Sequence, residues 1–353
     1  MKLLIAGAKT KFFHLKEFGD ALERQGIDYK LVHDVDVYDG FPSRNISHWF
    51  QSTTKFDNLI EEFKPDAVFV DRQRHFSLAV IKKKIPLFML LRGEYWTEIK
   101  WAKETLYKAP HRRLALWQWQ KIAEKCFSGS TEIIPICKYL EAVVKEHYPN
   151  KPTHVLHGGI DVSRWYPAHG MELKHPCVGL LQGAWIWGKT NEMLTLTKVL
   201  EAMPNVTFYW AGDGPYRDNV LNVLKKHDNF KWLGPLGYPD KVREYLAAID
   251  VYALVSGLDM SPLTLQEAAL MEKPVVATNA GGIPELMDKN NTGFLVEKGD
   301  YNGWIEKLSI LINDNKKAKQ MGKAGREFVK ENFSWDQIAK KFITILDSTL
   351  QKP

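Results

Sequence analysis

The chain has 353 residues, 45% of them hydrophobic and 25% charged, and carries a formal net charge of +6 at pH 7. That length is too great for one ordinary hydrophobic core and suits two domains, while the composition excludes an intrinsically disordered chain. No apolar run approaches the ~20 residues that a membrane-spanning helix needs. The apolar stretch after Lys2 is interrupted at Lys9, which is too early for the core of a signal peptide.

The net positive charge indicates the kind of partner, and the cysteines indicate the cellular compartment. The positive charge is spread along the chain, which suits anionic substrates or an anionic membrane surface, and no nucleic-acid-binding motif is present. Cys126, Cys137 and Cys177 form no CxxC pair and no metal-binding spacing. We therefore expect reduced thiols, a cytoplasmic protein and no nucleic-acid partner.

The N-terminal half alternates short apolar runs with amphipathic stretches. Five runs rich in Val, Ile, Leu and Phe are expected to be strands: residues 3–8, 29–34, 65–71, 86–93 and 132–137. Helical patterns lie between them, beginning with residues 14–25. Buried strands separated by helices predict an α/β domain with a parallel sheet covered on both faces.

A glycine-rich and then charged segment, residues 156–176, is the expected hinge, and a second alternating series follows it. Its expected strands are residues 177–183, 206–212, 230–234, 250–256, 274–282 and 294–300, and its helices are 189–202, 216–227, 239–248 and 263–271. A last amphipathic helix follows Ser334, with Gln337 in a capping-box position. The sequence thus predicts two Rossmann-like domains, residues 1–157 with the C-terminal segment 334–353, and residues 158–333.

The most informative stretch is SGLDMSPLTLQEAALMEKPVVATNAGGIPEL, residues 256–286. Ser261 is a favoured N-cap and Pro262 a favoured first helical residue, so a helix is expected to begin there. The unpaired amides of Leu263 and Thr264 would then form a phosphate site at the positive end of the helix. Glu267 lies one turn further on the same face, where its carboxylate can accept both hydroxyls of a ribose.

Each of these residues taken alone is better explained as a helix cap or a solvated glutamate. Their neighbours favour a nucleotide site, because AGDGP (211–215) and NAGGIPEL (279–286) place glycine turns at strand ends of the same sheet. Lys189, in GAWIWGK after the first strand of this domain, can neutralise a diphosphate. No G-x-G-x-x-G follows a strand with an acid some twenty residues on, which excludes an NAD site.

Taken in order, these motifs resemble the large family of retaining nucleotide-sugar glycosyltransferases known as glycosyl transferases group 1, similar to glycosyltransferase family 4. The family's E-x7-E signature reads Asp259…Glu267 here, and WLG (232–234), GGIPEL and TGFLV (292–296) keep the family's order. LHGGIDVSRWYP resembles the family's hinge segment. The resemblance covers roughly residues 130–345 and implies a GT-B fold, an α/β architecture of two Rossmann-like domains facing across a cleft.

The resemblance also implies an activity and residue roles. We expect transfer of a hexose from a nucleotide-diphosphate sugar to a hydroxyl acceptor, with retention, without a bound metal and without a cofactor. Glu267 would hold the ribose, Lys189 would hold the diphosphate, and the amides of Leu263 and Thr264 would bind phosphate oxygens. Gly183 and Ser261 are further donor-binding candidates. Residues just past Gly234 would border the nucleobase. Asp259 and the amides after it would face the hydroxyls of the transferred sugar.

Three departures from the family pattern concern the site. The first acid of the pair is Asp259, followed by Met260-Ser261-Pro262 in place of Gly-Phe-Gly, so one amide donor is lost at the proline. Ala184 stands where an arginine is common. Arg92 ends the fourth strand, at a position where the family often has a histidine. Together with Asp259 and Lys189 it is a catalytic candidate.

The acceptor is expected to contact the N-terminal domain. Candidate residues at strand ends are Gly7, Lys9, Asp71, Arg72 and Glu94. Each is also compatible with an ordinary solvated loop position. The acceptor class stays open between a saccharide and a lipid-linked molecule.

The segment 95–125 combines tryptophans with lysines and arginines, and two interpretations of it stay open. Its helices either lie on an anionic membrane at the inner face of the cell or pack their tryptophans against the sheet. Two rival functions are also considered. One is other chemistry on the same fold, such as sugar-nucleotide epimerisation, and the other is a degenerate transferase-like module that binds nucleotide sugar without turnover.

Overall fold

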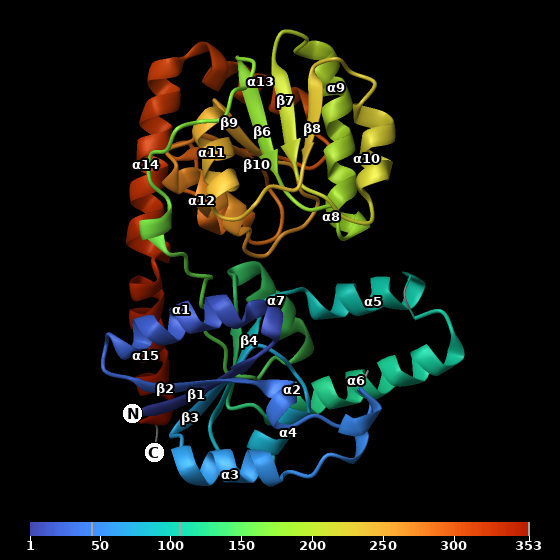
Figure 1. The fold of residues 1–353 in the computed structure, drawn as a ribbon, viewed down its shortest axis with the longest axis vertical. Helices are drawn as coiled ribbons and strands as arrows, with labels where there is room; N and C mark the ends of the chain where they lie inside the picture. The colour runs from blue at the N-terminus through green and yellow to red at the C-terminus, as the bar shows by residue number, and fades with distance from the viewer. Residues whose placement is uncertain (44, 106, 352–353) are drawn as a thin grey trace. The chain divides into compact units, whose positions relative to one another are not determined.

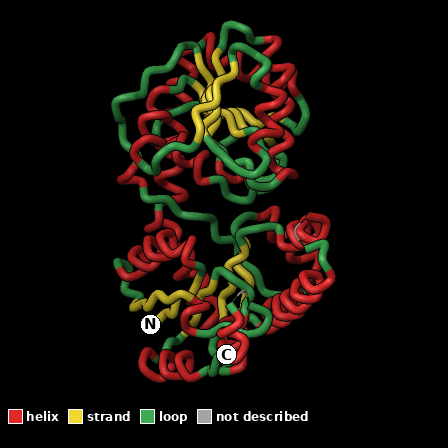
Figure 2. Tube along the Cα trace, turned by 45° about the vertical axis from the view of Figure 1, so that its right-hand side comes forward, coloured by secondary structure: helices red, strands yellow, loops and turns green. Residues whose placement is uncertain are grey.

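The computed structural model describes residues 1–43, 45–105 and 107–351. The chain forms two compact units, residues 1–159 with 335–353, and residues 160–334. In Figures 1 and 2 the strands of each unit lie at its centre and helices surround them. Within the described ranges no helix is long and apolar enough to cross a membrane.

The N-terminal unit contains a five-stranded parallel sheet in the order β2-β1-β3-β4-β5. Its strands are β1 (Lys2–Gly7), β2 (Asp28–His33), β3 (Ala67–Val70), β4 (Leu87–Leu91) and β5 (Glu132–Pro135). Its helices are α1 (Phe12–Glu23), α2 (Asp34–Val37), α3 (Thr54–Phe63), α4 (His75–Lys82), α5 (Tyr95–Thr105), α6 (Pro110–Gly129), α7 (Lys138–His147) and α15 (Trp335–Leu350). Residues 352–353, the end of the predicted C-terminal segment, lie outside the described residues.

Helices α1 and α15 cover one face of this sheet. Phe18 of α1 and Phe342 of α15 both pack against Phe69 of β3, with ring centroids 5.2 and 5.0 Å away. The Trp335 indole Nε1 donates to the Glu17 carboxylate over 2.9 Å, which ties the two helices together. Alternate strand residues such as Leu3 and Ile5 belong to the same cluster. The C-terminal helix is thus part of the N-terminal unit.

The second unit contains a six-stranded parallel sheet in the order β11-β10-β9-β6-β7-β8. Its strands are β6 (Cys177–Leu181), β7 (Thr207–Ala211), β8 (Phe230–Gly234), β9 (Val251–Leu254), β10 (Val275–Thr278) and β11 (Gly293–Val296). Its helices are α8 (Trp187–Thr190), α9 (Leu196–Ala202), α10 (Arg217–Leu224), α11 (Asp240–Ala248), α12 (Leu263–Leu270), α13 (Tyr301–Asn313) and α14 (Asn315–Phe333).

Both faces of the second sheet are buried, as the apolar strands predict. One face packs against α11, α12 and α14, with Tyr245 and Leu265 among the contacts. The other packs against α9, α10 and α13, with Trp304 of α13 fully buried. All eleven predicted strands are present, most of them shorter than expected because the terminal residues turn into loops.

The helix expected at 189–202 is wrong as a single element. The structure contains the short α8, a 3₁₀ turn at Asn191–Thr195 and then α9. The three free cysteines, Cys126, Cys137 and Cys177, are all buried and none is paired in a disulfide.

Candidate functional site

The predicted donor residues gather at the carboxyl edge of the second sheet. The chain runs from β6 to β7 and β8 on one side and returns to β9 on the other, so β6 and β9 form a topological switch point. Ligands of open α/β sheets bind at such points. The Gln182 side chain bridges the two strand ends, since its Nε2 donates to Val255 O over 2.8 Å and its Oε1 accepts from Val255 N over 3.0 Å.

Helix α12 begins at Leu263, the start of the expected range 263–271, and one residue after Pro262, the first helical residue that the capping pattern indicated. Pro262, with φ −68° and ψ 109°, is the N-cap, Leu263 is the first helical residue, and no side chain caps the helix. Ser261 as N-cap is therefore wrong, because extended Pro262 separates it from the first turn. Leu265 N donates to Pro262 O over 3.2 Å. The amides of Leu263 and Thr264 come before this bond and are the first two amides of the helix.

Glu267 lies within α12 and is 4% exposed. Burial raises the pKa of its carboxyl to about 7, although a hydrogen bond from Tyr238 acts in the opposite direction. Tyr252, buried beside it, donates from its hydroxyl to Thr264 Oγ1 over 2.7 Å and so fixes that side chain at the start of the helix. Sequence reasoning missed both partners, because Tyr238 belongs to no recognised motif and Tyr252 was identified only as part of the expected strand 250–256.

The two predicted catalytic residues of this unit contact each other. Lys189 Nζ lies 3.6 Å from Asp259 Oδ1, and each side chain is a little over one quarter exposed. Asp259 Oδ1 also accepts from Met260 N over 2.9 Å, so the amide expected to face a sugar hydroxyl is already bonded. Two hydroxyls nearby in sequence, Thr190 Oγ1 and Ser261 Oγ, are buried and have no hydrogen-bond partner among the described residues.

Glycines let the loops approach each other behind Asp259. Gly257 N donates to Lys189 O over 2.9 Å, and Gly282 N donates to Asp259 O over 2.7 Å. Gly281 has φ +60°, and a Cβ built there would lie 2.3 Å from Asp259 O. The backbone of the NAGGIPEL loop therefore sets the position of Asp259.

Replacing Gly281 by alanine should destabilise the protein by about 1–3 kcal/mol, because it combines left-handed backbone strain with a collision. The collision should also displace Asp259. Gly299→Ala is the matched control: Gly299 has φ +74°, but nothing lies within 4 Å of its Cβ position. Thermal unfolding of both variants separates the two effects, and equal losses would show that the contact with Asp259 O is unimportant.

The loop after β6 explains one departure from the family pattern. Ala184 is fully buried, and its N and O bond Asp213 O and Tyr216 N over 2.9 and 3.0 Å. An arginine side chain at this position would have no room. Gly183 precedes it at the exposed strand end, where a Cβ would lie 2.6 Å from Trp185 Cδ1.

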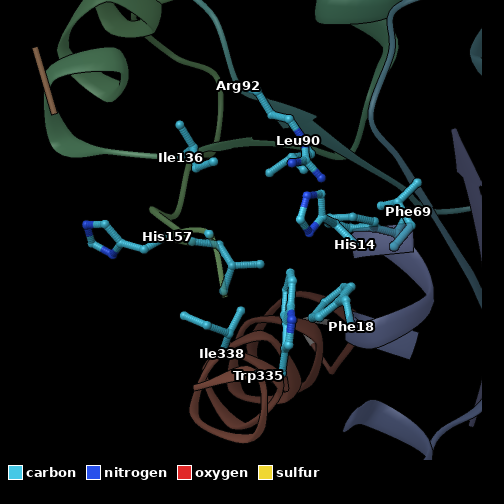
Figure 3. Close-up of a pocket in the computed structure, with 12 residues that line it drawn as sticks. His14, Phe18, Phe69, Leu90, Arg92, Ile136, His157, Trp335 and Ile338 are labelled. Atoms are coloured by element: carbon cyan, nitrogen blue, oxygen red, sulfur yellow. The ribbon is translucent and has the colours of Figure 1, made fainter. Parts of the chain in front are cut away.

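In the N-terminal unit Arg92 lines a cavity of about 20 Å³, the space of roughly one water molecule. Figure 3 shows its side chain extending toward His14, with Trp335 and Ile338 of α15 on the opposite side. Burial lowers the pKa of its guanidinium while Asp71 opposes that effect. Arg92 Nε is buried without a hydrogen-bond partner among the described residues.

Asp71 joins Arg92 at the ends of β3 and β4. Its Oδ1 accepts from Ala8 N over 3.2 Å, and a Cβ on Gly7 would lie 2.7 Å from the same oxygen. Burial raises the pKa of the Asp71 carboxyl, although Arg92 and Arg72 lower it. Gly7, Asp71 and Arg92 therefore form one cluster at this sheet edge.

The other acceptor-side candidates have local partners. Lys9 Nζ pairs with Asp36 Oδ2 at 3.0 Å on the surface. Arg72 binds both carboxylate oxygens of Asp34. Glu94 is 4% exposed, and its Oε2 accepts from Thr97 N over 2.8 Å at the start of α5, so it serves as a helix cap.

Within the described ranges one group of side chains has the geometry to hold a metal ion: His175, Cys177 and Asp250. These residues lie where β6 and β9 begin, at the amino edge of the sheet. His175 Nδ1 contacts Asp250 Oδ2 at 2.8 Å, so hydrogen bonding explains the group. The predicted donor residues lie at the opposite edge.

Comparison with known proteins agrees with this geometry. The family model described as "Glycosyl transferases group 1" matches residues 191–314. The N-acetyl-alpha-D-glucosaminyl L-malate synthase of Bacillus anthracis is 34% identical over 40% of this chain, a match that spans 37% of that enzyme's length. An uncharacterized glycosyltransferase of Methanocaldococcus jannaschii is 26% identical over 95% of this chain and 89% of its own.

A solved structure of Anabaena HepE in complex with UDP shares the fold. It superposes with a TM-score of 0.68 over 99% of this chain and 100% of HepE, at 16% sequence identity. The match extends the likeness to the first 130 residues, where the sequence indicated architecture only. Residues 191–314 thus match the glycosyl transferases group 1 family model, and the chain as a whole has the GT-B fold.

Proposed function

We propose that this chain is a glycosyltransferase that moves a hexose from a nucleotide-diphosphate sugar to a hydroxyl acceptor, with retention at the anomeric carbon. The observation that carries the proposal is the convergence of three groups at the β6/β9 switch point. These are the uncapped start of α12, the Lys189 ammonium and the buried Glu267 carboxylate. UDP bound to HepE is the kind of ligand that such a site would take.

Each part of the donor would meet a group suited to it. The two ribose hydroxyls donate to the Glu267 carboxylate, and phosphate oxygens accept from the amides of Leu263 and Thr264. Lys189 neutralises the diphosphate as the bond between the anomeric carbon and the phosphate oxygen breaks. The buried hydroxyls of Thr190 and Ser261 supply two more hydrogen-bonding groups that lack a partner among the described residues.

In the proposed reaction the acceptor oxygen bonds the anomeric carbon on the face that the diphosphate leaves. The acceptor proton passes to the leaving phosphate oxygen. Asp259 orients hydroxyls of the transferred sugar. The reaction as proposed uses no metal ion and no cofactor, and it takes place in the cytoplasm.

Binding of nucleotides tests the donor site directly. We expect UDP, GDP or ADP, or one of their hexose derivatives, to raise the melting temperature, because a ligand of the folded state stabilises it by about 2.7 kcal/mol at one hundred times its Kd. Glu267→Ala should remove the shift, while Glu306→Ala, an exposed glutamate on α13, should keep it. No shift with any nucleotide would rule out the proposed donor site.

A further inference from the structure

A second, larger pocket lies wholly within the N-terminal unit. Its volume is about 380 Å³, and it opens between the segment after β3 and helices α5 and α6. Arg72, Gln73, Arg74 and His75 form a polar wall, while the other wall is largely aromatic and aliphatic. The polar wall follows the carboxyl end of β3, the edge at which α/β sheets bind ligands.

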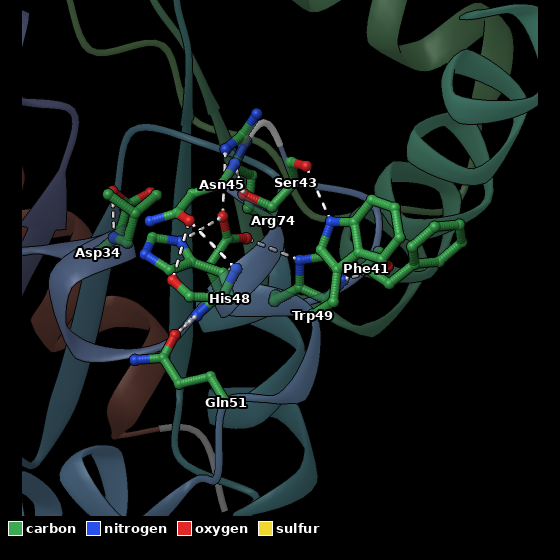
Figure 4. A network of polar contacts seen from close by, with 12 residues as sticks. Asp34, Phe41, Ser43, Asn45, His48, Trp49, Gln51 and Arg74 are labelled. Carbon is green, nitrogen blue, oxygen red and sulfur yellow. Dashed lines mark hydrogen bonds and ion pairs between the residues drawn. The ribbon is translucent and has the colours of Figure 1, made fainter. Parts of the chain in front are cut away.

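The polar wall is held in place by Asp39, which is 2% exposed. Asp39 contacts His75 Nδ1 at 2.9 Å and Arg74 Nη1 at 3.8 Å. Burial would raise the pKa of Asp39, yet hydrogen bonds from His75 and Ser43 and the charge of Arg74 hold it at about 2. Figure 4 shows Arg74 and His48 in this network, with Ser43 and Asn45 beside them. The Arg74 guanidinium carbon also lies 5.7 Å from the centroid of the Trp119 ring, so the arginine is positioned between Asp39 and the tryptophan.

The pocket carries little surplus positive charge. Arg72 is paired through two nitrogens with Asp34, and Arg74 lies against Asp39. Glu98 lines the same pocket. Two arginines thus face three carboxylates, while His48 and His75 both contact Asp39. A phosphate would find the guanidinium charges already matched, whereas hydroxyl groups need directional donors and acceptors without net charge.

The opposite wall offers an aromatic surface. Trp119 is fixed by its Nε1, which donates to Pro42 O over 2.6 Å, and Tyr107 meets its ring edge-on at 6.0 Å. Leu116 and Ile122 extend this wall. The Tyr95 hydroxyl oxygen is buried and has no hydrogen-bond partner among the described residues. An aromatic wall facing fixed polar groups suits the C–H face and the hydroxyls of a sugar ring.

We propose that this pocket binds the acceptor and that the acceptor presents an uncharged hexose-like ring to it. The proposal rests on the proposed function, because it assigns the acceptor of that reaction. It selects a neutral saccharide over an anionic head group. Arg74 and Gln73 bind ring hydroxyls, and the ring's C–H face lies on the wall of Trp119 and Tyr107.

Filling the pocket tests the site without removing any polar contact. Ala102 lines the pocket from α5, so Ala102→Phe places a ring inside it, and Lys103→Phe places the same ring on the exposed face of that helix. The affinity of the full chain for methyl hexosides is measured by saturation-transfer NMR. It should fall about tenfold or more in Ala102→Phe and stay within about twofold of wild type in Lys103→Phe. Gln73→Ala, a partly exposed loop change, should weaken binding severalfold with unchanged melting temperature.

Hexose phosphates, measured in parallel, test the chemical class. The neutral-saccharide assignment would be overturned if hexose phosphates bind more tightly than methyl hexosides and if Ala102→Phe removes that binding. Absence of hexoside binding, or equal loss in both phenylalanine variants, would overturn the site. Hexoside binding in a chain that shows no nucleotide shift would leave this pocket assigned and contradict only the donor proposal.

Discussion

Glu267→Gln should stabilise the ligand-free protein at pH 8 by about 3 kcal/mol, because the folded chain buries an ionised carboxylate there. The pKa of Glu267 is raised from 4.5 to about 7, and a pKa difference of one between the folded and unfolded states corresponds to about 1.36 kcal/mol. Between pH 4.5 and 7 the folded state binds more protons than the unfolded state, so wild-type stability falls as pH rises through this window. Glutamine has the same shape and no charge, so its advantage should be largest at pH 8 and small at pH 5.

Unfolding measured at pH 5 and pH 8 for Glu267→Gln and for the exposed control Glu306→Gln tests this expectation. An advantage that does not grow with pH would contradict the raised pKa of Glu267. The same substitution should weaken nucleotide binding, because an amide has one acceptor oxygen and no charge, whereas the carboxylate offers two charged acceptor oxygens to the ribose hydroxyls. Wild-type nucleotide affinity should strengthen from pH 6 to pH 8 as Glu267 ionises. A substitution that stabilises the protein and weakens binding indicates a residue kept for function although it destabilises the fold.

The architecture was predictable because both sheets are buried on two faces. Strands such as Leu87–Leu91 are continuous apolar runs, and the helices between them show helical periodicity, so local pattern and final structure agree. The start of α12 was predictable to within one residue for the same reason. Ser261 failed as its N-cap because Pro262 adopts ψ 109°, an angle that sequence preference alone did not indicate.

The contacts that complete the site were not predictable, because they join residues from different strand ends. Tyr238, which bonds Glu267, follows β8 and belongs to no motif. Gln182 bridges to Val255, 73 positions further along the chain. Ala184 could be recognised as a departure from the family pattern, but only its complete burial explains why an arginine is absent there. Such pairings depend on register and loop packing, which single-sequence patterns do not encode.

Lys189→Gln should lower turnover by about 10²–10³-fold while changing nucleotide affinity much less, because a preorganised cation acts mainly on the charge that develops on the leaving diphosphate. The substitution also removes the partner of Asp259, 3.6 Å away. Lys189→Gln combined with Asp259→Asn restores a neutral pair and should recover the melting temperature without recovering turnover. Release of nucleoside diphosphate in the presence of acceptor measures the effect, with the exposed Lys198→Gln on α9 as control. Turnover within about threefold of wild type would show that Lys189 does not bear on the leaving group, and recovery in the double variant would show that its role is only to hold Asp259.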